Sequence, residues 1–275
     1  MRAVHLHCPG IALVNMLIIQ PGRSTNVSDK VEKKESAFGE TFKVIIQALL
    51  LALVIRSFLF QPFSIPSGSM MPTLLVGDYL FVSKYAYGYS RYSFPFSPNL
   101  FSGRIWGGEP KRGDIAVFRL PRDPKIDYIK RVTGLPGDRM QMIDSVLHIN
   151  GVPVKRMREG SFRPDDSYDT GSETPVFVET LPNGVSFDTL DLIPNAVGDN
   201  TREFVVPAGH YFMMGDNRDD SQDSRFAGAV GFVPFENFVG RAEFIFYSTD
   251  GSARFWEFWR WPGVTRWGRI GQGVN

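Results

Sequence analysis

The longest hydrophobic run in the chain extends from residue 42 to residue 60 and follows a polar, charged stretch. At about 1.5 Å rise per residue, a helix of this length reaches roughly 28 Å, close to the thickness of a bilayer hydrocarbon core. Gln47 and Arg56 interrupt the run, and Arg56 stands near its end, where a long side chain reaches lipid headgroups. The pattern predicts a transmembrane anchor over 42–60, with a buried helix of a soluble domain as the alternative.

Basic residues are unevenly placed about this segment. Four lysines precede or open it, and after residue 60 the next Lys or Arg is Lys84. The four are Lys30, Lys33, Lys34 and Lys43. By the positive-inside rule, the N-terminus is cytoplasmic and everything after the anchor lies outside. Residues 1–41 are expected to be a disordered cytoplasmic tail, because 22–40 is polar and the apolar run 11–19 is too short to span a bilayer.

After the anchor, short apolar runs alternate with turn residues, and no helical period is visible. Asn150-Gly151 is a strong hairpin signal. The predicted strands are 79–83, 115–118, 127–133, 140–149, 152–156, 203–206, 210–214 and 240–247. Strands in series without intervening helices predict a mainly β fold, with an antiparallel, barrel-like sheet in a domain over 61–275.

Two parts of this domain have a weaker pattern. Residues 157–200 are polar and contain prolines, and we expect an insertion with one hairpin near 175–181. Residues 85–108 are rich in Gly, Pro, Ser and aromatic residues. They predict a long surface loop whose aromatic side chains either reach the membrane interface or cover the core.

Composition narrows the classes of function. The 275 residues carry a net charge of +1, so nucleic acid is not an expected partner. Hydrophobic residues make up 43%, enough for a proper core. Cys8 is the one cysteine, so no intrachain disulfide forms and an exported domain depends on that core.

Ser67 and Ser69 follow the anchor closely and flank Gly68, between Pro66 and Pro72. The prolines favour a stiff, non-helical loop that presents both hydroxyls. A polar linker leaving a membrane helix is the simpler interpretation of a lone Ser-Gly-Ser. The full stretch Pro-Ser-Gly-Ser-Met-Met-Pro-Thr-Leu, however, resembles the nucleophile box of bacterial type I signal peptidases.

Lys130 lies in the predicted strand 127–133, on the same face as Tyr128 and Val132. A lysine there is either paired or desolvated, and desolvation lowers its pKa so that the neutral amine can accept a proton from serine. Alone, it would be read as an ordinary edge or ion-pair residue. The stretch Tyr-Ile-Lys-Arg-Val-x-Gly-Leu-Pro-Gly-Asp resembles the family's general-base box, which assigns that role to Lys130 and leaves Arg131 structural.

Residues 214–225 form a strongly polar stretch. Alternating acidic and hydroxyl residues resemble a calcium loop, but Ser224 and Val230 stand where such a loop needs Gly and Glu, so we predict no metal. The stretch also resembles the family's Gly-Asp-Asn-Arg-Asp-x-Ser-x-Asp-Ser-Arg signature. That resemblance implies that Ser221 hydrogen-bonds the amine of Lys130, while Asp223 and Arg225 brace the site. Residues 226–230 depart from the family pattern.

Four histidines are alternative bases for a Ser-His-Asp arrangement. His5 and His7 lie in the predicted cytoplasmic tail, which leaves His148 and His210. Both fall in predicted strands or beside turns, and we expect them to be structural.

The resemblance extends from the anchor to about Gly240. It implies a membrane-anchored serine endopeptidase that removes N-terminal signal peptides from exported preproteins after a small-x-small motif, without cofactor or metal. Ser69 would be the nucleophile, Lys130 the base, and Ser67 an oxyanion donor. The expected partners are secretory preproteins and the lipid bilayer, which the aromatic residues of 255–267 would contact.

The expected location is the bacterial inner membrane, crossed once, with a monomeric catalytic domain in the periplasm. Two rival classes remain: a Ser-Lys protease of the self-cleaving repressor type, and a catalytically silent β-domain that binds exported peptides.

Overall fold

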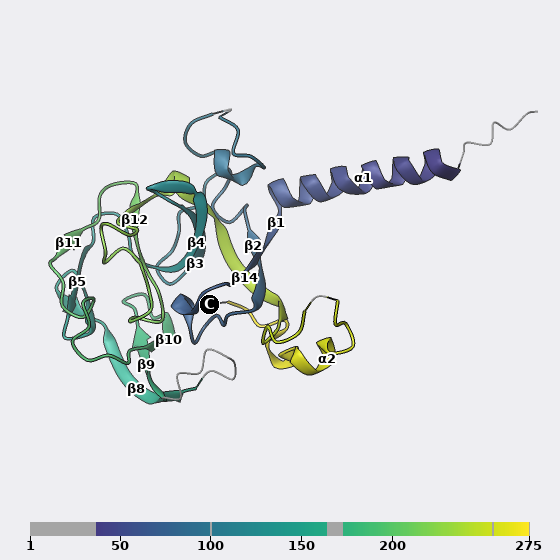
Figure 1. Ribbon diagram of the computed structural model, residues 1–275. Helices are drawn as coiled ribbons and strands as arrows, with labels where there is room; N and C mark the ends of the chain where they lie inside the picture. Colours follow the sequence, from purple (N-terminus) through teal and green to yellow (C-terminus); the bar gives the residue numbers. More distant parts are fainter. Residues whose placement is uncertain (1–36, 100, 164–172, 255, 275) are drawn as a thin grey trace, which may run out of the picture. The chain divides into compact units, whose positions relative to one another are not determined.

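The computed structural model describes residues 37–99, 101–163, 173–254 and 256–274. The chain divides into two units, Met1–Ile45 and Ile46–Asn275. Most of the predicted tail, with Cys8, His5 and His7, lies outside the described residues. The helix α1 covers Ala37–Phe58 (Figure 1). It is long and apolar enough to cross a membrane over Gly39–Phe58, and it ends before the predicted limit because Phe60 already opens a strand.

A seven-stranded sheet forms the centre of the second unit, in the order β1-β2-β14-β3-β4-β12-β13. Every neighbouring pair in it is antiparallel, which confirms the predicted mainly β, antiparallel fold. Its strands are β1 (Phe60–Ser64), β2 (Asp78–Ser83), β3 (Ile115–Leu120), β4 (Asp123–Gly134), β12 (His210–Met214), β13 (Val233–Pro234) and β14 (Phe238–Ser248).

The core lies on both faces of this sheet. One cluster joins Leu80, Val117 and Ile245, and a second, on alternate positions, joins Phe118, Val132 and Phe238. Because successive side chains of a strand point to opposite faces, adjacent residues of β3 supply both clusters. The strands that carry the site are therefore fixed by packing on two sides.

A second sheet has the order β11-β5-β6-β7. Its strands are β5 (Arg139–Ile143), β6 (Val146–Ile149), β7 (Val152–Pro153) and β11 (Phe204–Val205). The hairpin at Asn150-Gly151 is confirmed, with φ of 56° and 79°. The single strand predicted over 140–149 is wrong, because Asp144 and Ser145 adopt φ of 47° and 63° and turn the chain into another hairpin.

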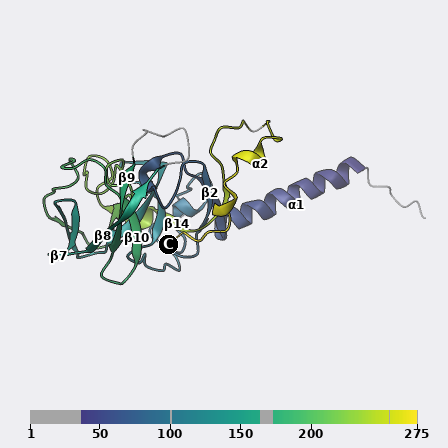
Figure 2. The same ribbon diagram turned by 90° about the horizontal axis from the view of Figure 1, so that it is seen from below.

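The insertion contains more structure than the sequence predicts. Its three strands, in the order β10-β9-β8, are β8 (Lys155–Phe162), β9 (Thr174–Thr180) and β10 (Ser186–Leu190). Figure 2 shows them side by side. The predicted hairpin near 175–181 is therefore wrong, since that stretch is the central strand of a sheet.

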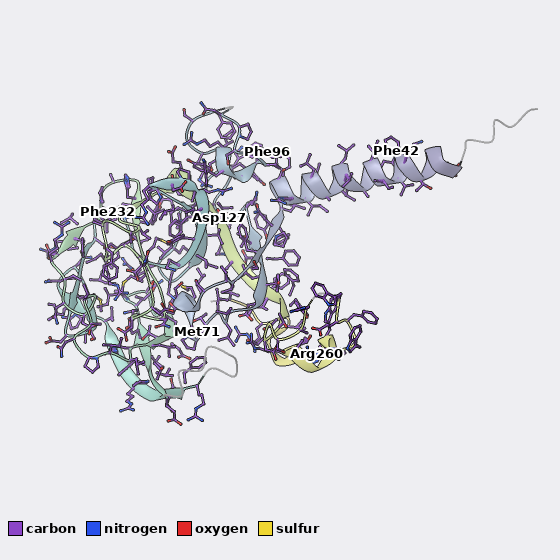
Figure 3. All side chains as sticks on the ribbon, in the orientation of Figure 1. Phe42, Met71, Phe96, Asp127, Phe232 and Arg260 are labelled. Atoms are coloured by element: carbon purple, nitrogen blue, oxygen red, sulfur yellow. The ribbon has the colours of Figure 1, made fainter. Side chains whose placement is uncertain are left out.

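The remaining elements are short. They are the 3-10 turns Gly68–Met70, Arg91–Ser93, Phe235–Asn237 and Trp267–Arg269, and the helix α2 (Trp261–Val264). The aromatic side chains of the loop 85–108 differ in exposure, and their contact with a membrane stays a prediction. Tyr87 and Tyr92 are buried, whereas Phe96 and Trp106 are 104% and 83% exposed, and Figure 3 shows Phe96 on the outside of its loop.

Candidate active site

Ser69 lies in the 3-10 turn Gly68–Met70, which follows β1. Ser67, just before the turn, has an extended backbone. The polar loop 215–225 holds this turn in place: the backbone N–H of Asn217 donates to Ser69 O at 3.2 Å, and its side-chain amide donates to Gly68 O at 3.3 Å. Ser69 is buried and Ser67 is exposed, and both line one large pocket.

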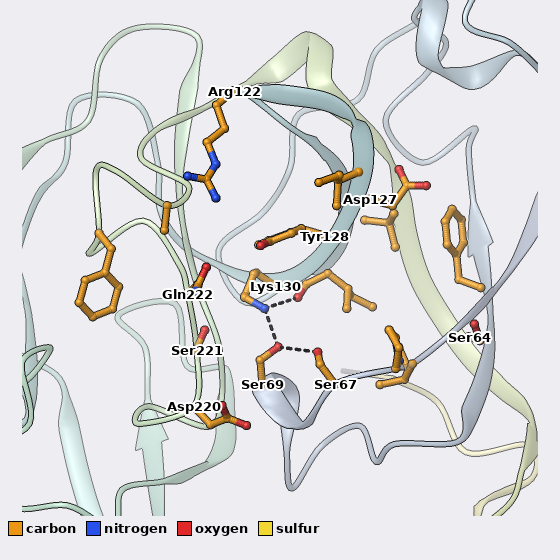
Figure 4. A pocket seen from close by; sticks show the side chains of 18 of the residues that line it. Ser64, Ser67, Ser69, Arg122, Asp127, Tyr128, Lys130, Asp220, Ser221 and Gln222 are labelled. Atoms are coloured by element: carbon orange, nitrogen blue, oxygen red, sulfur yellow. Dashed lines mark hydrogen bonds between the residues drawn. The ribbon is translucent and has the colours of Figure 1, made fainter. Parts of the chain in front are cut away.

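Lys130 enters this pocket from β4. Its Nζ donates to Ser69 Oγ at 2.6 Å and to Ile129 O at 3.1 Å, and it lies 5.4 Å from the centroid of the Tyr128 ring. Figure 4 shows the amine directed at Ser69. The structure thus brings together the two side chains that the sequence placed 61 positions apart.

The lysine is 4% exposed. Burial lowers the pKa of Lys130 to about 8, whereas the nearby carboxylates of Asp223, Asp216 and Asp220 act in the opposite direction. A neutral amine is therefore well populated slightly above neutral pH, and a neutral amine is the form that accepts a proton.

Ser67 is placed beside Ser69, with 3.4 Å between the two Oγ atoms. The distance is at the long end of a hydrogen bond. Ser67 therefore presents a second hydroxyl at the mouth of the pocket, next to the Ser69 hydroxyl (Figure 4).

Ser221 also lines the pocket, but the hydrogen bond that the sequence resemblance implied does not form. Its Oγ is buried and has no hydrogen-bond partner among the described residues, while the amine of Lys130 binds Ser69 and Ile129 instead. The predicted hydrogen bond is therefore wrong for this structure.

Asp223 and Arg225 form the predicted pair, with 2.9 Å between Oδ2 and Nη2 and both side chains buried. Burial alone raises the pKa of Asp223, but the Arg225 guanidinium and two backbone N–H groups hold it below its ordinary value. The carboxylate therefore stays ionised and keeps the loop closed around Gly215, whose N–H it accepts at 3.1 Å.

Arg131 is structural, as expected, and its partner is a residue that sequence reasoning missed. Its guanidinium binds Asp216 at 2.9 and 2.7 Å, completely buried. Asp216 also accepts from Thr73 at 2.6 Å. Since Arg131 follows Lys130 and Thr73 follows the serine turn, Asp216 joins the three segments of the site. The only feature of the sequence that pointed to Asp216 was its position in the polar stretch 214–225.

The pocket has two differently built sides. On one side Phe63 to Ile65 of the β1 segment face Ile126 to Ile129 of β4, and β12 pairs with β4 only from Arg131 onward. Before that point, this edge of β4 pairs with no strand among the described residues. On the other side the lining comes from the polar loop and the segment after it, with Arg122 at the wall.

The histidines considered as alternative bases lie outside the pocket. Within the described part of the chain no histidine lines the pocket, and Nδ1 of His148 and of His210 lies about 3 Å from Val146 O and Ala208 O. Asp191, Asp199 and Asp219 have carboxylate oxygens within 4.8 Å of one another. Arg156 already pairs with Asp191, and two backbone N–H groups bind Asp219.

Fold and site together define a mainly β protein in which a buried lysine meets a serine hydroxyl in an open pocket, an arrangement typical of serine peptidases. The chain belongs to the signal peptidase family, peptidase S26, whose match covers residues 38–247.

Curated relatives agree with this assignment. Signal peptidase I of Rickettsia typhi is 47% identical over 236 residues, which are 82% of this chain and 84% of that protein. Signal peptidase I of Rickettsia akari is 48% identical over 73% of this chain and 76% of that protein. The crystal structure of a signal peptidase I from Enterococcus faecalis V583 is 28% identical and covers 49% of this chain and 97% of its own, with a TM-score of 0.28.

Proposed function

We propose that this protein is a membrane-anchored serine endopeptidase that removes signal peptides from exported preproteins, with Ser69 as nucleophile and Lys130 as general base. The 2.6 Å contact between Lys130 Nζ and Ser69 Oγ carries the proposal. The relatives named Signal peptidase I supply the substrate class.

The reaction begins when the neutral amine of Lys130 takes the proton from Ser69 Oγ. The alkoxide attacks the carbonyl carbon at the cleavage site, and the negative charge moves to the carbonyl oxygen. The backbone N–H of Ser69 and the hydroxyl of Ser67 are the proposed donors to this oxyanion. Each such donor typically contributes about 3 kcal/mol to the stability of the transition state.

The ammonium of Lys130 then gives its proton to the leaving amine as the peptide bond breaks. The mature polypeptide departs, and the signal peptide remains as an ester on Ser69. A water molecule loses a proton to the same lysine and attacks the ester, and the proton returns to Ser69 Oγ. The lysine thus serves as base and acid in turn, which its pKa of about 8 suits.

The substrate segment before the cleavage site is proposed to add as a strand along the open edge of β4. Main-chain hydrogen bonds would hold it there, and alternate side chains would enter the pocket. Ile65, Val117 and Ile129 give that side an apolar lining. A shallow apolar site next to Ser69 accepts small side chains, which fits a small-x-small motif.

Membrane attachment is proposed through α1, with the N-terminus in the cytoplasm and the β domain in the periplasm. Lys43 at the start of the helix and the lysines before it support this orientation. Because a signal peptide is itself held in the bilayer, anchoring raises the local concentration of enzyme and substrate for each other.

Cleavage of a purified preprotein in detergent tests the proposal. We expect one cut after a small-x-small motif, identified by the mass of the product, and its loss in Ser69→Ala. Replacing the small residue before the cut by Phe in the substrate should stop cleavage. If the wild-type protein cuts nothing but still binds the preprotein, the rival peptide-binding function replaces this one.

A further inference from the structure

We infer that Asp220 is a specificity-determining residue, whose carboxylate favours basic and disfavours acidic residues in the first positions of the polypeptide released by cleavage. This inference rests on the proposed function and adds a charge preference to its substrate class.

Asp220 lies against the backbone that carries the nucleophile. A Cβ built on Gly68 would be 3.2 Å from Asp220 Oδ2. The side chain is exposed and lines the same pocket as Ser69 and Lys130. Figure 4 shows it beside Ser69, so its charge acts on whatever peptide occupies this part of the pocket.

The carboxylate of Asp220 has no partner of its own within the described residues. The backbone N–H of Asp220 donates to Asn217 Oδ1 at 3.3 Å, but no lysine, arginine or hydroxyl binds the side chain. The neighbouring Asp216 and Asp223 each pair with a buried arginine. The carboxylate of Asp220 can therefore interact with a charged side chain of a bound substrate.

The position of Asp220 in the pocket indicates which substrate residues it meets. Ser64 and Asp127, from the strands that would hold the segment before the cleavage site, lie on one side of Ser69 in Figure 4, and Ser221 and Gln222 lie on the other. A chain that runs along β4 and passes Ser69 therefore continues beside the loop that carries Asp220. The residues just after the cleavage site follow that path.

Arg122 limits how far this preference extends. It lines the pocket and donates to Gly228 O at 2.5 Å, and in Figure 4 it lies across Lys130 from Asp220. Of the other carboxylates that line the pocket, Asp127 pairs with Arg119 and Asp219 is held by two backbone N–H groups. We therefore assign the preference to Asp220 and to the first two residues after the cut.

The test uses preproteins that differ only in carrying Lys, Gln or Glu at the second residue after the cleavage site. We expect kcat/KM to fall in that order, with a Lys-to-Glu ratio of about ten at low salt that shrinks as salt screens the interaction. In Asp220→Asn, which keeps the shape and removes the charge, the ratio should fall to about two or less.

Asp188→Asn is the matched control, because Asp188 is an exposed carboxylate on β10 that does not line the pocket. It should keep the wild-type ratio. Cleavage of the Gln substrate by wild type, and its loss in Ser69→Ala, tests the proposed function separately. A wild-type ratio near one, an unchanged ratio in Asp220→Asn, or an equal loss on all three substrates would each overturn the charge preference while cleavage itself stands.

Discussion

At the scale of single residues, two buried serines of the polar loop differ in their hydrogen bonding. Ser224 Oγ accepts from Met213 N at 2.9 Å and donates to Gly231 O at 2.5 Å. Ser221 Oγ, three positions earlier, is buried without a partner. A buried hydroxyl without a hydrogen bond costs stability, so its presence beside Lys130 suggests a role in the reaction.

The two serines should therefore differ when each is replaced by alanine. We expect Ser221→Ala to keep or slightly raise the free energy of unfolding, because no hydrogen bond is lost and an unpaired buried hydroxyl is removed. Ser224→Ala leaves the N–H of Met213 and the carbonyl of Gly231 unpaired and should cost about 1–3 kcal/mol. Urea unfolding followed by circular dichroism measures both. A larger loss in Ser221→Ala than in Ser224→Ala would show that Ser221 is paired after all.

At this scale, the sequence identified the residues of the site more reliably than the hydrogen bonds between them. The pairing of Ser69 with Lys130 came from family resemblance, since neither residue stands out by itself. Strand alternation placed Lys130 on the face of Tyr128 and Val132 but left open whether it was paired or desolvated, and the structure shows it buried. The Ser221 bond is absent because Lys130 Nζ donates to Ser69 Oγ and Ile129 O instead, a choice among acceptors that no sequence pattern specifies.

At the scale of elements, the inserted sheet β8–β10 holds the polar loop of the site. Glu179 on β9 binds Arg218 at 2.7 Å with both side chains buried. The backbone of Leu190 on β10 exchanges hydrogen bonds with Asp216 O and Arg218 N, at 2.9 and 2.8 Å. Since Arg218 also donates to Gly215 O, the insertion fixes the conformation that places Ser221 and Asp223.

Removing Glu179 from its buried ion pair with Arg218 should lower the stability of the protein. We expect Glu179→Ala to lower the free energy of unfolding by about 3–5 kcal/mol, because it leaves the Arg218 charge buried and uncompensated. Glu173→Ala, at an exposed ion pair of 3.8 Å with Arg163, is the control and should change it by less than about 1 kcal/mol. Equal effects of the two substitutions in urea unfolding would mean that the insertion does not support the loop.

The sequence did not reveal one turn and one strand, and each omission has a physical reason. Asn150-Gly151 was recognised because both residues favour a positive φ, whereas the turn at Asp144 and Ser145 contains no glycine. β8 was missed because most of its residues are exposed, so it has no alternation of apolar and polar positions. Its strand character comes from pairing with β9, which only the folded chain supplies.

At the scale of the whole molecule, apolar surface remains uncovered on the C-terminal segment. Phe258 and Trp267 are 68% and 65% exposed, and Trp256, Trp259 and Trp261 are also exposed. The segment lies beyond residue 247, where the family match ends. Exposed tryptophans interspersed with arginines are typical of a membrane interface.

Replacing these tryptophans should weaken contact with lipid. A chain truncated before β1 should bind liposomes, and the triple change of Trp256, Trp259 and Trp261 to Ala should reduce binding about ten-fold or more, because each buried aromatic side chain contributes 1 kcal/mol or more. Flotation with liposomes measures the fraction of protein that is bound. Ile193→Ala with Val197→Ala removes exposed apolar groups from the loop after β10 and is the control. Equal binding by the two variants would exclude a C-terminal lipid contact.

The central claim is that neutral Lys130 activates Ser69, and the pH dependence of cleavage tests it most directly. Burial lowers the pKa of Lys130 to about 8, so the neutral fraction grows as pH rises through that value. Lys84 is a buried lysine whose pKa burial also lowers to about 8, but it binds Ser93 O and does not line the pocket. Because titration of either lysine would give a cleavage rate with a midpoint near pH 8, both lysines must be replaced in the test.

The measurement is kcat/KM on one preprotein from pH 6 to 10 for wild type, Lys130→Ala and Lys84→Met, each checked for its fold by circular dichroism. We expect the wild-type value to rise with a midpoint near 8, Lys84→Met to keep that midpoint, and Lys130→Ala to lose about 10⁴-fold or more. Cleavage that survives in folded Lys130→Ala, or a midpoint that moves with Lys84 and not with Lys130, would contradict the account.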